Sequence, residues 1–145
     1  MLTSIDHVNI VVQDLDGAVY FFESLGFVVE DRAALSGEWI SEIVGLKEVQ
    51  AEYVKLKLED SGPRLELIRY DAPVSEGATG GGEAHDPGIR HLAFRVEDID
   101  TVVSSLEGKV DFFSSVQTYE VTGKRLIYFR GPEGILLELA EYPEE

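Results

Sequence analysis

The stretch that decides the fold is IDHVNIVVQDLD, residues 5–16, because a related stretch, IRHLAFRVEDID, recurs at residues 89–100. A second pair of related stretches lies toward the other end of each half, LELIRY at residues 65–70 and LELAEY at residues 137–142. Each copy therefore opens with a histidine on an expected strand and closes with a glutamate on an expected strand. This pattern predicts two copies of one structural unit, both carrying the same two kinds of potential metal ligand.

Side-chain alternation places each of these histidines and glutamates on the sheet face opposite the apolar core. Along a strand, successive side chains point to opposite faces of the sheet. The apolar side chains of each stretch must face the core, and the histidine or glutamate belongs to the opposite set. The sets are Val8, Ile10 and Val12 against His7; Leu65 and Leu67 against Glu66; Leu92, Phe94 and Val96 against His91; and Leu137 and Leu139 against Glu138. We therefore expect all four candidate ligands to face a cleft.

Each half is expected to follow the order β-α-β-β-β. The predicted strands are residues 4–12, 27–31, 53–58 and 64–70 in the first half, and residues 89–96, 110–116, 124–130 and 135–142 in the second. Asp14 and Asp98 are the predicted N-caps of the two helices, and a glycine closes the apolar stripe of each. Residues 37–45, which contain Trp39, are expected to form a further short helix.

The predicted fold class is α+β. A single β-α-β-β-β unit leaves one face of its sheet uncovered, so two units must pair to bury a core. We expect one domain over residues 1–145, in which two paired βαβββ modules form a cupped mixed sheet around a central metal cleft. Module one spans residues 1–73 and module two spans residues 88–145. The glycine- and proline-rich residues 74–87 are the predicted linker.

The composition narrows the class of protein. The chain has 28 acidic and 12 basic residues, which gives a net charge of −16. This charge repels phosphate backbones, so nucleic-acid binding is not expected. Cysteine is absent, which excludes disulfides and thiol catalysis and fits a cytoplasmic protein. No apolar run is long enough to cross a membrane, and the first residues lack the features of a signal peptide.

The positions of Glu66 and Glu138 indicate that both carboxylates bind one cation. A glutamate flanked by leucines on a central strand is costly to bury alone. Two such glutamates at matching positions, each in a half that also offers a histidine, indicate a shared divalent cation, whose charge the two carboxylates neutralise. His7, Glu66, His91 and Glu138 supply two nitrogen and two oxygen donors. Such a set suits one ion of zinc, nickel, cobalt, manganese or iron, with positions open for water or substrate.

These stretches resemble the vicinal oxygen chelate superfamily, which includes glyoxalase I, bleomycin-resistance proteins, methylmalonyl-CoA epimerase, fosfomycin-resistance enzymes and extradiol dioxygenases. The resemblance covers nearly the whole chain and is most specific at residues 5–8, 88–96 and 128–139. It implies paired βαβββ modules that form a cupped sheet around a metal, often within a homodimer. It also implies a ligand set that looks like that of glyoxalase I, namely His7, Glu66, His91 and Glu138.

The resemblance also distinguishes between branches of the superfamily. Extradiol dioxygenases use two histidines and one glutamate, and the position that matches Glu66 is not a ligand there, so Glu66 favours a lyase or isomerase. After this glutamate, glyoxalase I carries a Thr-Tyr-Asn-Trp-Gly-type stretch, whereas residues 67–73 of this chain read LIRYDAP. The glutathione-binding pattern is therefore missing.

The expected function is that of a metal-dependent lyase or isomerase of glyoxalase type. The metal would polarise two vicinal oxygens of a small-molecule substrate and acidify the carbon-bound proton next to the carbonyl. Glu138, preferred by resemblance, or Glu66 would take and return this proton. Two alternatives stay open: a metal-dependent extradiol-type dioxygenase, and a metal-free small-molecule binding protein of bleomycin-resistance type.

Three further residues are candidates for substrate binding. Arg95 shares the strand parity of His91 and can pair with an anionic substrate group or with a glutamate of the protein. Asn9 shares the parity of His7 and can support the ligands by hydrogen bonding. Trp39 can form a wall of the pocket, although plain aromatic packing is the commoner role of such a residue.

Overall fold

The chain divides into two compact units, Met1–Gly77 and Ala78–Glu145, which we call the N-terminal and C-terminal modules. The structure is a computed structural model that describes residues 1–77 and 81–144. The division falls within residues 74–87, the predicted linker. Residues 78–80 of that linker, and Glu145, lie outside the described residues. The predicted boundaries at residues 73 and 88 remain predictions.

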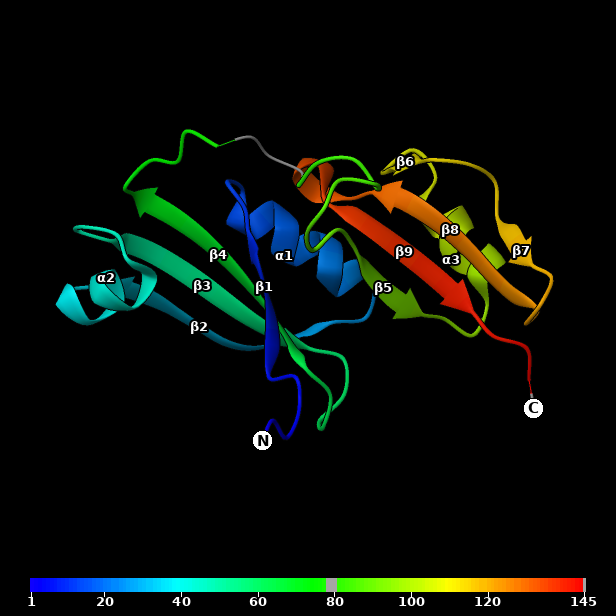
Figure 1. The fold of residues 1–145 in the computed structure, drawn as a ribbon, viewed down its shortest axis with the longest axis horizontal. Coiled ribbons are helices and arrows are strands. Elements are labelled where there is room, and N and C mark those ends of the chain that lie inside the picture. The colour runs from blue at the N-terminus through cyan, green and yellow to red at the C-terminus, as the bar shows by residue number, and fades with distance from the viewer. Residues whose placement is uncertain (78–80, 145) are drawn as a thin grey trace. The chain divides into compact units, whose positions relative to one another are not determined.

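The N-terminal module is a mixed four-stranded sheet with two helices (Figure 1). Its elements are β1 (His7–Val11), α1 (Leu15–Ser24), β2 (Val28–Ser36), α2 (Glu38–Val44), β3 (Gln50–Lys57) and β4 (Arg64–Ala72). The strand order is β1-β4-β3-β2, in which β1 runs parallel to β4 and the other neighbours are antiparallel. Helix α1 packs against β3 and β4.

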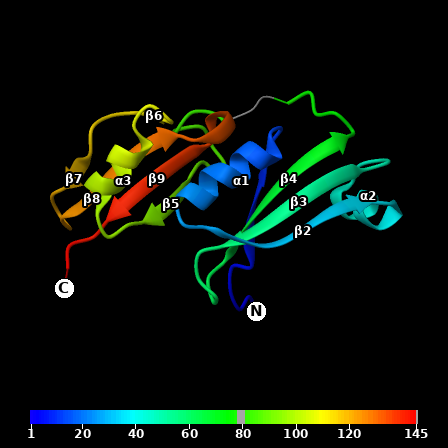
Figure 2. The same ribbon diagram turned by 180° about the vertical axis from the view of Figure 1, so that it is seen from behind.

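The C-terminal module repeats this plan with a five-stranded sheet. Its elements are β5 (Leu92–Arg95), α3 (Ile99–Leu106), β6 (Asp111–Phe112), β7 (Gln117–Tyr119), β8 (Lys124–Arg130), the 3₁₀ turn η1 (Pro132–Gly134) and β9 (Leu136–Glu141). The order is β5-β9-β8-β6, with β7 also paired to β8, and β5 runs parallel to β9. Helix α3 packs against β9, on the side shown in Figure 2. Two mixed sheets with few helices confirm the predicted α+β class.

The two principal helices begin where the sequence predicts. The Asp14 side chain accepts a hydrogen bond from the Gly17 N–H at 3.0 Å, and the Asp98 side chain accepts one from the Thr101 N–H, also at 3.0 Å. Both aspartates are therefore N-caps, which satisfy backbone donors that a helix start leaves unpaired. The predicted helix within residues 37–45 is α2. No helix in the described part of the chain is long and apolar enough to cross a membrane.

The predicted inward residues Leu65, Leu67, Leu137 and Leu139 are buried, although β9 is buried on both faces from Leu136 to Ala140. In the N-terminal module the fully buried residues include Phe22, Val54, Leu56, Leu65 and Leu67; in the C-terminal module they include Ile99, Leu106, Phe129, Leu137 and Leu139. Leu58, the last residue of the strand predicted at residues 53–58, is 52% exposed. The reason is that β3 ends at Lys57, so strand alternation no longer fixes the direction of the next side chain.

Several predicted strand bounds also differ from the structure: β1 begins at His7 rather than at residue 4, and β3 begins at Gln50 rather than at residue 53. The strand predicted at residues 89–96 is confined to β5, and Ile89 is 95% exposed, because Gly88 adopts a φ of +124° that breaks the extended path. The strand predicted at residues 110–116 is only the two-residue β6, and β7 follows as a separate short strand along β8. Strand β2 continues to Ser36, beyond the predicted end at residue 31.

Candidate metal and substrate site

In the N-terminal module, His7 and Glu66 come together on neighbouring parallel strands. His7 is the first residue of β1, and Glu66 lies in β4 opposite Asn9. The histidine therefore lies two residues before the direct partner of the glutamate, on the same face of the sheet. His7 Nε2 is 3.9 Å from Glu66 Oε2, which is too far for a hydrogen bond.

The C-terminal module brings His91 and Glu138 together in the same way. His91 directly precedes β5, and Glu138 lies in β9 opposite Ala93. The histidine is again two residues before the partner of the glutamate. His91 Nε2 is 3.9 Å from Glu138 Oε2, the same separation as in the first module. The sequence repeat is thus a repeat of register and of side-chain geometry.

Each module unites two of the four predicted ligands. Over residues 1–77 and 81–144, no group of three or more histidine, cysteine, aspartate or glutamate side chains converges as a cation site would require.

Hydrogen bonds to neighbouring residues leave one potential metal-binding atom available on His7 and one on Glu66. Asp6 Oδ2 lies 2.6 Å from His7 Nδ1 and forms a hydrogen bond with it, so that Nε2 is the ring nitrogen that faces Glu66. This hydrogen bond also lowers the pKa of Asp6. Asn9 Nδ2 donates to Glu66 Oε1 at 2.9 Å. The remaining atoms, Nε2 of His7 and Oε2 of Glu66, are the two that lie 3.9 Å apart.

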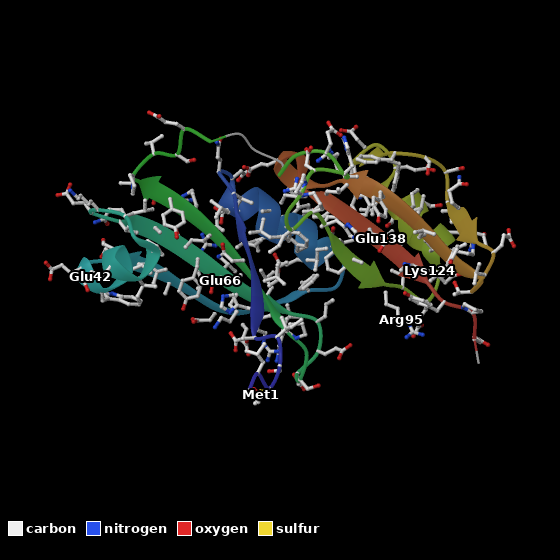
Figure 3. All side chains as sticks on the ribbon, in the orientation of Figure 1. Met1, Glu42, Glu66, Arg95, Lys124 and Glu138 are labelled. Carbon is white, nitrogen blue, oxygen red and sulfur yellow. The ribbon has the colours of Figure 1, made fainter. Side chains whose placement is uncertain are left out.

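The second pair is more deeply buried. Glu138 is 4% exposed and is the one buried charged residue in the described chain. Its Oε1 lies 3.6 Å from Lys124 Nζ, and its Oε2 faces His91. Figure 3 labels Glu138 and Lys124 on β9 and β8. The ring of His91 lies 4.8 Å from that of Tyr128, the residue of β8 that pairs with Glu138.

A row of polar side chains crosses the N-terminal sheet through Glu66. The register joins Asn9 to Glu66, Glu66 to Lys55, and Lys55 to Asp31, one residue from each of the four strands. Beside this row, the Tyr53 hydroxyl donates to Asp31 Oδ2 at 2.6 Å. That hydrogen bond raises the pKa of Tyr53, with a smaller contribution from the negative charge of Glu66. One sheet face therefore combines carboxylates, an ammonium group and a phenol around a predicted ligand.

The predicted substrate-binding residues lie in different surroundings. Asn9 contacts Glu66, in agreement with a supporting role. Arg95 ends β5, and its guanidinium carbon lies 5.2 Å from the centre of the Tyr142 ring. Trp39 lies on α2 and is 57% exposed, and among the described contacts none joins it to His7 or Glu66.

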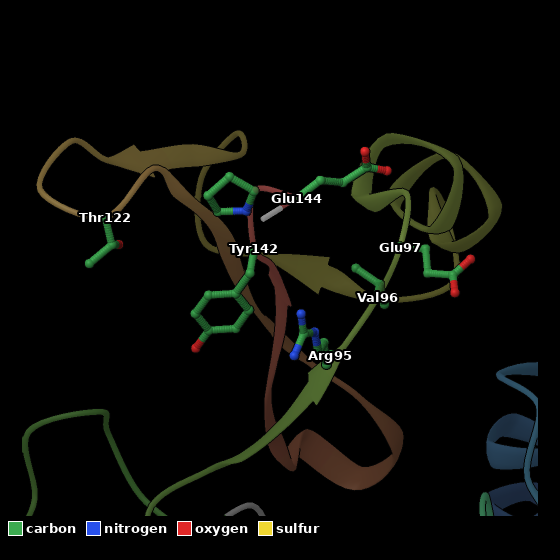
Figure 4. Close-up of a pocket in the computed structure, with 7 residues that line it drawn as sticks. Arg95, Val96, Glu97, Thr122, Tyr142 and Glu144 are labelled. Atoms are coloured by element: carbon green, nitrogen blue, oxygen red, sulfur yellow. The ribbon is translucent and has the colours of Figure 1, made fainter.

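Arg95 and Tyr142 line a pocket of about 780 Å³ in the C-terminal module (Figure 4). The remaining lining residues are Val96, Glu97, Thr122, Pro143 and Glu144.

Sequence reasoning missed several partners of the predicted ligands. Asp6 was within reach of prediction, because a carboxylate adjacent in sequence to a strand histidine can bind its ring nitrogen. Lys124 and Tyr128 approach Glu138 only through the pairing of β8 with β9, and Lys55 approaches Glu66 only through β3 and β4. The sequence carries no local signal for those registers.

Comparison with known proteins identifies the family. The sequence model of the Glyoxalase/Bleomycin resistance protein/Dioxygenase superfamily matches residues 4–139, which include all four predicted ligands. The chain belongs to this superfamily. The resemblance stated from the repeated stretches is therefore confirmed.

Three relatives show how this superfamily member compares. The uncharacterized protein YaeR of Escherichia coli is 43% identical over 143 residues, 97% of each chain. The 2-epi-5-epi-valiolone epimerase of an Actinomyces species is 29% identical over 97% of this chain and 80% of that protein. A crystal structure of a glyoxalase family protein from Bacillus cereus is 36% identical, with a TM-score of 0.92 over 99% of this chain and 97% of that one.

Proposed function

We propose that this superfamily member is a metal-dependent lyase or isomerase of glyoxalase type, in which His7, Glu66, His91 and Glu138 bind one divalent metal ion. The observation that carries the proposal is the repeated histidine–glutamate pair. Both pairs have the same register across parallel strands and the same 3.9 Å separation of Nε2 and Oε2. A shared function of the two pairs accounts for the preservation of this geometry in both modules.

The donor set fits a divalent ion. Two imidazole nitrogens and two carboxylates suit zinc, nickel, cobalt, manganese or iron, and the carboxylates neutralise the charge of the ion. Ligand atoms about 2.1 Å from a common metal lie roughly 3.0–3.4 Å apart, so the two atoms of each pair need to approach by roughly 0.5–0.9 Å. Glu138 adds a second argument, since a carboxylate that is 4% exposed is stabilised by a nearby cation.

The residues of each pair have distinct roles in the proposed reaction. A bound metal supplies Lewis-acid polarisation of two vicinal oxygens of the substrate. Glu138 removes the carbon-bound proton next to the substrate carbonyl and returns it, and Glu66 is the second carboxylate able to do so. Asn9 fixes the orientation of Glu66 through its hydrogen bond, and Lys124 compensates the charge of Glu138.

The relative named as an epimerase supports the proton-transfer chemistry. An epimerase inverts one carbon centre, which a carboxylate that removes and returns a proton accomplishes.

Deuterium exchange tests the proposed reaction. The metal-loaded protein is incubated in D₂O with acetoin or dihydroxyacetone, which carry vicinal oxygens and an acidic carbon-bound proton, and deuterium incorporation is followed by NMR. We expect incorporation with the natural chain and none with Glu138→Gln. Oxygen consumption by the iron-loaded protein with a catechol, without deuterium exchange in any substrate, would overturn the lyase or isomerase assignment in favour of a dioxygenase.

We further propose that the protein is a cytoplasmic homodimer, which the superfamily assignment and the absence of cysteine support. Light scattering coupled to size-exclusion chromatography tests the dimer. A mass of twice 16.1 kDa is expected, and a mass of 16.1 kDa at micromolar concentration would contradict it.

A further inference from the structure

Arg95 differs from the other arginines of the protein in that its guanidinium group has neither a hydrogen-bond nor an ion-pair partner among the described residues, whereas Arg90 donates to the Gly81 carbonyl and the other five are ion-paired. The ion-paired arginines are Arg32, Arg64, Arg69, Arg125 and Arg130. Arg95 has no carboxylate within ion-pair distance in the described part of the chain, although acidic residues outnumber basic ones 28 to 12. Its guanidinium group instead lies over the ring of Tyr142. The five donors of the group are thus left for a ligand.

The pocket beside Arg95 combines one cation with aromatic and hydroxyl groups. Its volume of about 780 Å³ suits a small molecule, and Thr122 and Tyr142 contribute hydroxyl-bearing side chains to its wall. Tyr142 is 45% exposed, so its ring offers apolar contact area to a ligand. Figure 4 shows Arg95 beside the Tyr142 ring, with Glu97 and Glu144 farther along the wall.

Lys124 connects this pocket to the buried glutamate of the C-terminal module. Its Nζ lies 3.6 Å from Glu138 Oε1 and 5.6 Å from the centre of the Tyr142 ring. The Tyr142 ring therefore lies beside two cations. Lys124 neutralises Glu138, whereas Arg95 has no carboxylate partner among the described residues. Arg95 also shares the strand face of His91, at a distance of roughly 13 Å along the extended chain. In the register of β5 against β9, Arg95 pairs with Ala140, which lies two residues after Glu138 on the same face of the sheet.

We propose that Arg95 and Tyr142 form a subsite for the carboxylate of a small organic acid, and that this carboxylate is the anionic end of the substrate. The binding of a carboxylate concerns the pocket alone, whereas its assignment to the substrate rests on the proposed function. Arg95 binds the carboxylate through its planar fork of donors, and Tyr142 holds the guanidinium group in place and covers the apolar part of the ligand.

The charges of the pocket select a carboxylate over a phosphate ester. Glu97 and Glu144 also line the wall, so the pocket has one guanidinium group and two carboxylates. A monoanion meets the attraction of Arg95 with limited repulsion from the two glutamates. Arg95 alone can neutralise a monoanion, whereas a dianionic phosphate ester keeps one uncompensated negative charge beside the two glutamates. Glu97→Gln consequently reduces the discrimination against the phosphate ester.

Three ligands with the same alkyl chain test the subsite: butyrate, butyramide and butyl phosphate. Binding to the chelator-treated full-length protein is measured by NMR at pH 7.5, with the Arg95 Nε–H signal and the Tyr142 ring as reporters. We expect millimolar binding of butyrate, weaker binding of butyl phosphate and no binding of butyramide. Arg95→Gln should weaken butyrate binding about tenfold or more, and Arg95→Lys should give an intermediate loss.

The matched control is Lys109→Gln, which removes one exposed positive charge outside the pocket of the same module and should leave butyrate binding unchanged. Equal effects of Arg95→Gln and Lys109→Gln would overturn the subsite, as would butyrate binding that Arg95→Gln leaves intact. Tighter binding of butyl phosphate than of butyrate would overturn the assigned ligand class. Butyrate binding depends on no metal, so a protein that binds butyrate at Arg95 yet fails every metal test retains the subsite and loses the proposed function.

Discussion

Glu138 Oε2 lies 3.9 Å from His91 Nε2, on a carboxylate that is only 4% exposed. The nearest ammonium group, that of Lys124, faces the other oxygen at 3.6 Å. In the N-terminal module the equivalent glutamate, Glu66, is oriented by Asn9 in the same manner, with one oxygen bound and the other facing a histidine. Each carboxylate therefore presents one oxygen to its own support and one to the imidazole.

Replacement of the buried carboxylate should stabilise the metal-free protein while it removes function. Glu138→Gln keeps the shape of the side chain and removes a buried negative charge that accepts no hydrogen bond within the described structure. We expect the free energy of unfolding of the metal-free protein to rise by about 1 kcal/mol, because the buried carboxylate is costly to desolvate, whereas Lys124, with a side chain that is 22% exposed, can be solvated once its partner is neutral. Urea denaturation measures this change.

The matched control for Glu138→Gln is Glu66→Gln. Glu66 has a side chain that is 21% exposed and is already hydrogen-bonded to Asn9, so the same substitution should change stability less. A loss of stability in Glu138→Gln larger than in Glu66→Gln would show that Lys124 over-compensates the buried charge.

Loss of the hydrogen bond from Asn9 should weaken metal binding without unfolding the protein. Asn9→Ala frees Glu66 Oε1 and lets the carboxylate rotate. Groups that orient a ligand typically change metal affinity by about tenfold or more. Competition with a chromophoric chelator measures the affinity for zinc. Val11→Ala, on the same strand and face but 57% exposed, is the control and should leave the affinity unchanged. Equal affinities of Asn9→Ala and the natural chain would remove Asn9 from the site.

The cap of α3 should contribute to stability in a pH-dependent way. Hydrogen bonds from the hydroxyl and backbone N–H of Thr101 lower the pKa of Asp98. Because the folded-state pKa is lower than that of the unfolded chain, this stabilisation is complete above the usual aspartate value of 3.8 and is lost as the pH falls through the lowered value. Asp98→Asn and Thr101→Val should both flatten the decline of stability below about pH 4. If stability declined below about pH 4 as steeply in both variants as in the natural chain, the contribution of the Asp98 cap would be contradicted.

Local signals were sufficient for much of the fold. Asp14 and Asp98 cap helices as predicted, because capping depends on residues within one turn. Alternation correctly placed His7 beside Glu66 and His91 beside Glu138, because side-chain direction along a strand is a local property. The sequence repeat predicted that both modules share one topology, and their strand orders agree.

Features that depend on pairing between distant strands were beyond prediction. The approach of Lys124 to Glu138 follows from the register of β8 against β9, and the stacking of Arg95 on Tyr142 joins residues that no local pattern connects. The predicted strand ends were wrong where a turn determines the end of the strand, as at Gly88 and after Lys57. The contacts between strands depend on tertiary pairing, about which the local pattern carries no information.

The metal content of the protein tests the central claim most directly. Protein purified without an affinity tag or chelator is analysed for zinc, nickel, cobalt, manganese and iron, beside His7→Ala and Glu138→Ala, one variant in each module. We predict about one equivalent per chain in the natural protein and loss of that metal in both variants, because the pairs serve one site. Absence of metal even after incubation with each ion, or retention of a full equivalent in either variant, would contradict the account.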